Sequence, residues 1–169
     1  MRWLGAVFIF AAALSMGLGC IARNNAHRIC LHDLCTMLRS FKAELSSRKP
    51  GLPELCRRTK ANSHGRAEAF LDQLCKDLSS LGVESFPKLW AEAAEKSICE
   101  LSPTELNCFK ELGLSLGRYT LERQLEEIGL CLTLLQGAEE NLIQGTPELR
   151  KLSLGLSLTA ASILTIVLA

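Results

Sequence analysis

The sequence lacks a strong net charge and the common motifs of nucleotide binding. Its 19 Lys and Arg side chains almost balance 18 Asp and Glu side chains, which leaves a net charge of +1. No basic stripe is available for nucleic acid, and the short run Arg57, Arg58, Lys60 is explained by a solvated helix face. Neither a G-x-x-x-x-G-K-[ST] loop nor a dinucleotide-binding glycine fingerprint is present. The chain is therefore expected to bind no nucleic acid, no nucleotide through these motifs, and no small-molecule substrate.

No segment alternates apolar and polar residues with β-branched enrichment, so no strand is expected. Apolar residues recur instead every three to four positions, the spacing of one helix face. This spacing predicts one long helix over 28–47, continuous with the apolar run before it, and further helices over 52–61, 67–81, 85–97, 103–117 and from residue 120 onward. The fold class is thus predicted to be all-α, a bundle of six helices joined by short turns.

Turn and capping residues set the expected helix boundaries. Pro50 ends the first helix together with the glycine after it, and Gly82 is expected to end the third. Ser85 is a plausible N-cap for the fourth helix. The run 102–105, Ser-Pro-Thr-Glu, carries a cap, a proline at the first helical position and a capping-box glutamate, which predicts the start of the fifth helix. Gly117 is expected to end it.

Both ends of the sequence are apolar. Residues 1–22 and 152–169 are each long enough to cross a bilayer core of about 30 Å, so both are expected to be transmembrane helices. Arg23 and Arg28 follow the first apolar run, and Arg150 and Lys151 precede the second. By the positive-inside rule, the middle domain, residues 23–151, is expected to face the cytoplasm.

Eight cysteines leave two interpretations open. The alternative reading is a secreted or lipid-anchored disulfide-rich helical domain, with the leader removed and the tail exchanged for a lipid anchor. Most of the cysteines lie inside helical periodicity beside leucines, where a free thiol acts as a small buried hydrophobe. The sequence also has no N-x-[ST] glycosylation acceptor. Reduced thiols are therefore favoured.

Two patterns resemble reactive sites and are interpreted otherwise. The run 113–117, Gly-Leu-Ser-Leu-Gly, matches the G-x-S-x-G of a nucleophile elbow, but no strand precedes it and no histidine follows His64. His27, Cys30, His32 and Cys35 spread by about 200° around a helix and do not converge on one ion. A metal site that recruits a second helix stays an alternative. We expect no enzyme, no catalytic residue, no metal and no cofactor.

The order of these features resembles the stage III sporulation protein AB family of endospore-forming bacteria, itself similar to the cytoplasmic helical domain of type II secretion platform proteins. The likeness covers nearly the whole chain. The residues that carry it are 4–6, 31–38, Glu44 followed by 52–55, 90–93, 113–117 leading to 124–125, and the step from Lys151 to Leu152.

This resemblance implies a non-enzymatic scaffold in the mother-cell membrane around the forespore, part of the secretion-like channel complex required for endospore formation. Its cytoplasmic bundle would contact a ring ATPase, the stage III sporulation AA protein, and its spans would contact other membrane members of the complex. The residues expected to shape or border the contact surface are Glu44, Pro53, Glu54, Gly117 and Gln124. Ordinary roles as helix caps, turns and solvated polar positions are the alternative for each.

Overall fold

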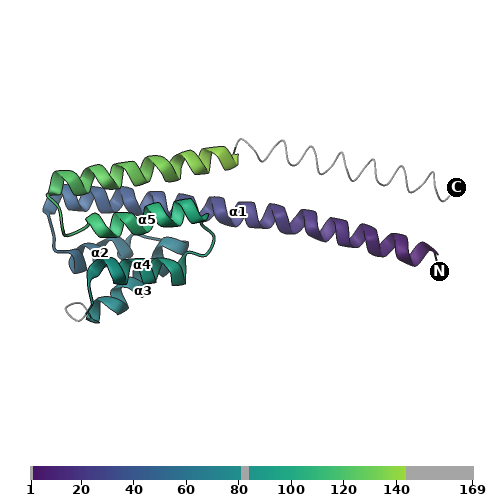
Figure 1. The fold of residues 1–169 in the computed structure, drawn as a ribbon, viewed down its shortest axis with the longest axis horizontal. Helices are drawn as coiled ribbons and strands as arrows, with labels where there is room; N and C mark the ends of the chain where they lie inside the picture. Colours follow the sequence, from purple (N-terminus) through teal and green to yellow (C-terminus); the bar gives the residue numbers. More distant parts are fainter. Residues whose placement is uncertain (1, 81–83, 144–169) are drawn as a thin grey trace. The chain divides into compact units, whose positions relative to one another are not determined.

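The computed structural model describes residues 2–80 and 84–143, and every regular element in them is helical. The helices are α1 (Arg2–Arg48), α2 (Leu52–Ala61), α3 (Gly65–Asp77), the short 3₁₀ helix η1 (Leu78–Ser80), α4 (Phe86–Ser97) and α5 (Pro103–Ser115), followed by a helical segment over residues 121–143, called here the last helix (Figure 1). The predicted all-α class with six α-helices is confirmed for the described residues.

The chain divides into two compact units, and the larger of them, His27–Glu139, is the helical bundle. The described residues 2–26 and 140–143 belong to the other unit. Inside the bundle, α3 packs on both α2 and α4, and α4 packs on α5.

The long first helix forms as predicted and continues without a break through residues 2–48. Apolar residues spaced three or four apart along α1 form its buried face: Leu31, Leu34, Leu38 and Phe41 have no exposed surface, and Leu45 is 5% exposed. Each buried side chain of this size contributes about 1.5 to 3 kcal/mol to folding. The three-and-four spacing of these residues therefore predicts correctly which side of α1 the other helices cover.

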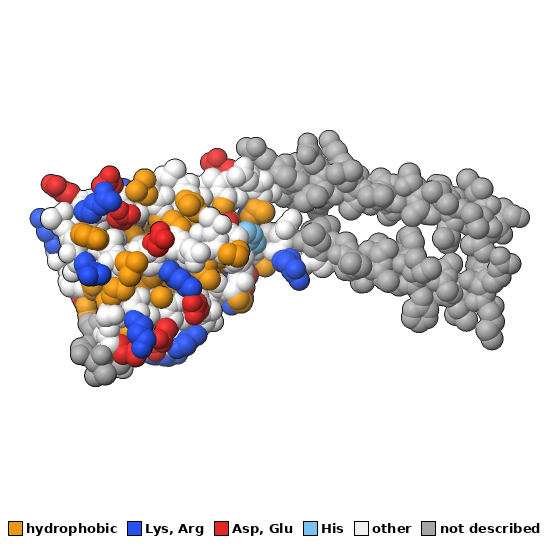
Figure 2. Space-filling model, in the orientation of Figure 1, with side chains coloured by type: hydrophobic (Ala, Val, Ile, Leu, Met, Phe, Trp, Pro, Cys, Tyr) orange, Lys and Arg blue, Asp and Glu red, His pale blue; other side chains and the backbone are white. Residues whose placement is uncertain are grey.

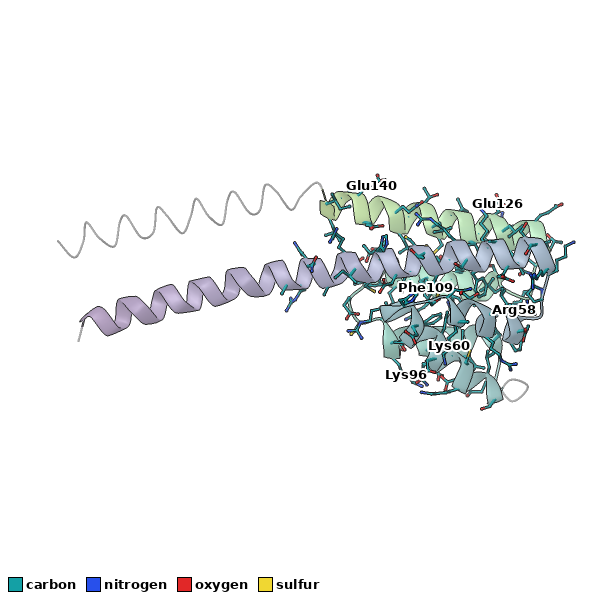
Figure 3. All side chains as sticks on the ribbon, turned by 180° about the vertical axis from the view of Figure 1, so that it is seen from behind. Arg58, Lys60, Lys96, Phe109, Glu126 and Glu140 are labelled. Carbon is teal, nitrogen blue, oxygen red and sulfur yellow. The ribbon has the colours of Figure 1, made fainter. Side chains whose placement is uncertain are left out.

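Trp90 on α4 is the centre of the core. Its ring packs within 4.8–6.0 Å, centroid to centroid, of four phenylalanine rings, Phe41, Phe70, Phe86 and Phe109. The buried indole Nε1 donates a hydrogen bond of 2.8 Å to the Phe109 carbonyl oxygen. Figure 3 shows Phe109 in the interior of the bundle. These contacts join α1, α3, α4 and α5, so one aromatic cluster fixes the relative positions of four helices.

The predicted capping box at the start of α5 is confirmed, and it also joins α5 to α1. The Glu105 N–H donates to Ser102 Oγ, and the Ser102 N–H donates to Glu105 Oε2 at 2.7 Å. The same Oε2 lies 2.8 Å from Nε2 of His27. Glu105 is 7% exposed, and these partners explain how its carboxylate is accommodated there.

The predicted end of the third helix needs correction, and its predicted cap lies outside the described residues. The third helix was expected to reach residue 81, but α3 ends at Asp77 and tightens into η1. Tight 3₁₀ turns are frequent at helix C-termini, where the last carbonyls lack α-helical partners. The expected cap Gly82 lies outside the described residues. Ser85 occupies the N-cap position of α4, although its side chain makes no capping hydrogen bond.

Transmembrane helices were expected at both ends of the sequence. Among the described helices, none contains a stretch that is both long and apolar enough to cross a membrane. Residues 2–22 form the first part of α1, which continues to Arg48. The second expected span, 152–169, lies outside the described residues.

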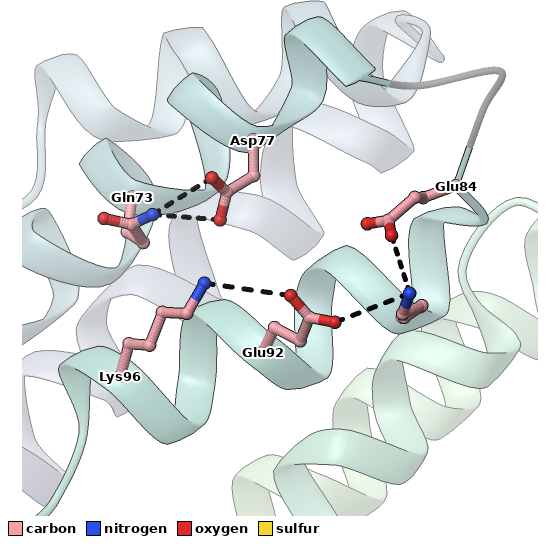
Figure 4. Close-up of polar contacts among 6 residues, drawn as sticks. Gln73, Asp77, Glu84, Glu92 and Lys96 are labelled. Atoms are coloured by element: carbon pink, nitrogen blue, oxygen red, sulfur yellow. Dashed lines mark hydrogen bonds and ion pairs between the residues drawn. The ribbon is translucent and has the colours of Figure 1, made fainter.

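The bundle surface carries both signs of charge side by side, as the face in Figure 2 shows. On α4, Glu92 lies between Lys88 and Lys96 at 3.8 and 3.7 Å, and Lys88 also reaches Glu84 at 2.6 Å (Figure 4). Exposed pairs of this kind contribute at most about 1 kcal/mol each. Their main effect is that most of the surface presents no single-sign field to a partner.

Candidate functional site

A hollow of about 290 Å³ opens where two turns, far apart in the sequence, meet at one end of the bundle. The first turn joins α1 to α2, and the second joins α5 to the last helix. We call this feature the end hollow. It is lined by Leu45, Lys49, Pro50, Gly51, Leu52, Gly117, Leu121 and Gln124.

Gly117 shapes the wall of the end hollow. It follows the C-cap of α5 with a φ of +78°, the left-handed conformation that glycine adopts without the steric cost of a side chain. A Cβ built on Gly117 would lie 2.7 Å from Leu52 Cδ1, too close for two carbon atoms. Glycine here therefore ends α5, as predicted, and lets the second turn approach the start of α2.

Gln124 is the polar side chain held inside the wall. It is 9% exposed, and its Nε2 donates a hydrogen bond of 2.7 Å to the carbonyl oxygen of Tyr119. Its own backbone N–H donates to the carbonyl oxygen of Thr120 at 3.0 Å. These two bonds tie the turn to the first turn of the last helix, so the amide has a structural role as well as a place in the hollow.

The five residues expected at a contact surface are related to the end hollow to different degrees. Gly117 and Gln124 line it. Pro53 and Glu54 directly follow the lining residue Leu52, and Glu44 precedes the lining residue Leu45, but these three do not line the hollow themselves. The structure thus brings two of the five together and leaves three beside them.

Glu54 and Glu44 differ in how their carboxylates are satisfied. Glu54 is 43% exposed and pairs with Arg58 at 2.7 Å and Arg57 at 3.6 Å, in the first turn of α2 where an acidic side chain suits the helix dipole. Glu44 has a buried oxygen, Oε2, that accepts no hydrogen bond from any described residue. An unpaired buried acceptor is unusual, which makes Glu44 the more informative of the two.

Three cations that the sequence argument did not single out surround the end hollow. Lys49 lines it, Arg48 comes directly before Lys49, and Arg118 directly follows Gly117. All three side chains are exposed, and none forms an ion pair with the residues that the structure describes. No sequence signal distinguishes them from paired surface cations, because pairing depends on which acids the fold places nearby.

The G-x-S-x-G pattern is structural. Ser115 is 5% exposed, and its Oγ donates a hydrogen bond of 2.9 Å to the Leu112 carbonyl oxygen within α5. A serine hydroxyl used in this way has no base beside it to activate it as a nucleophile. The interpretation of this run as a chance match is supported by the geometry of the serine.

The histidines and acids form no metal site in the part of the chain that the structure describes, where no three metal-binding side chains come together. His27 is bonded to Glu105, and His32 Nδ1 lies 3.1 Å from Glu139 Oε1. Both imidazoles are thus paired with carboxylates on other helices. Each pair joins α1 to a later segment of the bundle.

The seven described cysteines are free thiols. Burial raises the pKa of Cys30 and of Cys56 to about 12, and burial also raises the pKa of Cys35 to about 11. A thiol with so high a pKa holds almost no nucleophilic thiolate at neutral pH. The four buried cysteines, Cys30, Cys35, Cys56 and Cys131, therefore behave as core residues, whereas Cys75 and Cys108 are half-buried and Cys99 is exposed.

Comparison with known proteins relates the whole sequence to a sporulation family. The family model described as stage III sporulation protein AB matches residues 2–169 of this chain. A solved structure titled "Stage III sporulation protein AB (SpoIIIAB)" is similar to it with a TM-score of 0.64 and 21% sequence identity, over 73% of this chain and 98% of that chain. At this identity the structural likeness concerns the fold. No curated protein matches the chain significantly.

Proposed function

The chain belongs to the stage III sporulation protein AB family, and we propose that it is a non-enzymatic platform component of the channel complex between mother cell and forespore. Membership in this family supports a role in sporulation. In the proposal, the helical bundle is presented in the mother-cell cytoplasm to a ring ATPase, the stage III sporulation AA protein, while other membrane members of the complex contact the rest of the chain.

One observation carries the proposal: at the end hollow an apolar lining lies beside exposed cations that no described acid neutralises. Ser115, Glu105 and Gln124 are engaged in hydrogen bonds within the fold. Many cations pair with neighbouring carboxylates, whereas Arg48, Lys49 and Arg118 around the end hollow do not. Arg39 and Lys42 on α1 also lack an ion pair among the described residues, but they do not line the end hollow. A surface that its own fold does not satisfy fits a contact with another protein, and it offers no arrangement for catalysis.

Attachment to the mother-cell membrane is part of the proposal and rests on the sequence. The apolar runs 1–22 and 152–169 flank the bundle on both sides and carry basic residues at their inner ends. Two anchors would hold the bundle next to the bilayer and leave one of its ends available to the ATPase. Glu44, Pro53, Glu54, Gly117 and Gln124 would then shape or border the contact.

The experiment that tests the proposal is deletion in the source organism combined with capture of the ATPase. Deletion should block sporulation after engulfment, and expression of the full chain should restore it. The tagged full chain, extracted from membranes of sporulating cells, should retain the stage III AA protein. Normal spores after deletion, or extraction of the full chain without the ATPase, would contradict the platform proposal.

A matched pair of proline variants tests the location of the contact. Pro53 and Pro103 are both exposed and both lie at the first turn of a helix. Pro103 lies at the end of α5 that bonds to His27, about 27 Å along α1 from Leu45 at 1.5 Å per residue. Pro53→Trp should reduce ATPase capture, and Pro103→Trp should not. Equal capture by the two variants would contradict contact at the α2 end of the bundle.

A further inference from the structure

We propose that the end hollow receives an acidic segment of a partner protein and takes up one of its apolar side chains. The inference deepens the proposed function, on which it rests for the statement that a partner protein binds the bundle. It adds the chemistry of the partner's contacting segment: negative charge around one large apolar residue.

The floor of the end hollow is apolar. Leu45 is 5% exposed, and Leu52 and Leu121 are partly exposed at the start of their helices. Pro50 and the two glycines add ring carbon and backbone between the leucines, and Lys49 and Gln124 are the polar side chains of the lining. An apolar side chain that enters this space would remove leucine surface from water, at roughly 25 cal/mol per Å² buried.

The size of the end hollow fits a side chain better than a free ligand. Sites for small molecules commonly enclose about 300 to 1,000 Å³ and bury most of the ligand. The end hollow, at about 290 Å³, lies just below that range and is open to the surface. It therefore suits one anchoring side chain with its adjoining backbone, which is how protein contacts use such depressions.

The charges around the hollow determine which sign of charge a binding segment of the partner must carry. Lys49 lines it, and Arg48 and Arg118 flank the two turns, all three without an ion pair among the described residues. Glu122, next to Leu121, and Glu44, next to Leu45, oppose the three cations with two negative charges. Glu54 is neutralised by its own arginines on α2. The excess at this end is therefore positive, and an acidic segment would be attracted to it.

Helix dipoles do not change this conclusion. Two helices, α1 and α5, end at the hollow with their partially negative C-termini. Two others, α2 and the last helix, begin there with partially positive N-termini. Each terminus carries about half an elementary charge, so the four contributions largely cancel. The side-chain cations decide the local field, and they are the groups to change in a test.

The test measures binding of defined peptides to the purified full chain. The probe is a fluorescein-labelled ten-residue peptide with six Glu or Asp residues around one central phenylalanine. Two comparison peptides replace the phenylalanine by alanine, or all the acids by lysine. Fluorescence anisotropy should show binding of the first peptide only, weakened as NaCl is raised from 50 to 300 mM, since exposed charges are screened over about 10 Å at 0.1 M.

The test variant changes the cations without disturbing the apolar floor. Lys49 has a φ of +48°, a conformation that asparagine tolerates, so Lys49→Asn removes one positive charge and suits the turn, and Arg118→Glu replaces a second positive charge by a negative one. The control, Lys96→Asn with Lys110→Glu, makes the same charge change elsewhere. Lys96 lies toward the opposite end of the bundle from Arg58 (Figure 3). The test variant should weaken binding at least tenfold, and the control less than twofold.

Three results would overturn the inference: no binding of the acidic phenylalanine peptide to the unaltered chain, equal binding of the alanine peptide, or equal binding by the test variant. ATPase capture separates the two proposals. Capture by the test variant at the unaltered level would refute the end hollow as the contact and leave the platform function standing. If the unaltered chain binds the peptide but never captures the ATPase, the platform proposal fails and the acidic-segment site is retained.

Discussion

Replacement of Gly113 by alanine tests the packing of the core most directly. Gly113 is buried inside α5, and a Cβ built on it would lie 2.4 Å from Cδ1 and 2.6 Å from Cγ of Trp90. Trp90 has no exposed surface and packs against four phenylalanine rings. The indole therefore has no free space into which it can move when the methyl group is added.

The sign of the effect follows from two opposed magnitudes. Glycine to alanine inside a helix gains about 1 kcal/mol in intrinsic helix propensity. Insertion of a methyl group into a close-packed core costs about 1 to 3 kcal/mol. A shift of the indole also strains the 2.8 Å hydrogen bond from Nε1 to the Phe109 carbonyl, and loss of a buried bond costs about 1 to 3 kcal/mol more. We expect Gly113→Ala to lower the free energy of unfolding by about 2 kcal/mol or more.

Gly137 provides the matched control for this change. It lies in the last helix, and a Cβ built on it meets nothing within 4 Å. Gly137→Ala should therefore stabilise the chain by up to about 1 kcal/mol. Urea unfolding of both full-length variants, followed by circular dichroism at 222 nm, measures the two changes. If both substitutions shift the unfolding midpoint in the same direction, the reasoning from close contact with Trp90 is refuted.

Two further predictions concern titration and reactivity. Hydrogen bonds from Lys60 and Lys76 lower the pKa of Asp72 from 3.8 to about 2, so the stabilising effect of its carboxylate is present above pH 3.8 and is lost as pH falls through about 2. Asp72→Asn should therefore reduce stability at neutral pH but not below pH 2. A difference in urea midpoints that does not depend on pH would contradict this. In native protein, brief iodoacetamide treatment at pH 8 followed by mass mapping should modify the exposed Cys99, and labelling of the buried thiols before urea is added would show that the core opens freely. The buried thiols are Cys30, Cys35, Cys56 and Cys131.

The helices were predictable because their signals are local. The face of α1 can be derived from a three-and-four spacing, and the start of α5 from a four-residue capping box, since each depends on residues within one or two turns. The end of α3 was less predictable: the pattern extends to Leu81, whereas the α-helix ends at Asp77. Packing against neighbours decides the last turn of a helix, and a periodic pattern does not contain that information.

The candidate site was predictable only in part. Gly117 and Gln124 were named for their place in a family resemblance, and they line the end hollow. Lys49 and Arg118 were not named, because a sequence shows a cation without showing whether an acid lies within reach. Pro53 and Glu54 were named and lie beside the hollow, since α2 turns them away from the lining position of Leu52.

The sequence by itself determined the helical class, the number of α-helices and the buried face of α1, because helical periodicity depends on neighbouring residues. Only the tertiary structure decided which distant segments meet. It shows that Gly113 is small because Trp90, on a different helix, packs against it, and that turns about 70 residues apart enclose one hollow. Such contacts arise from the packing of whole helices, and no local pattern encodes the distance between them.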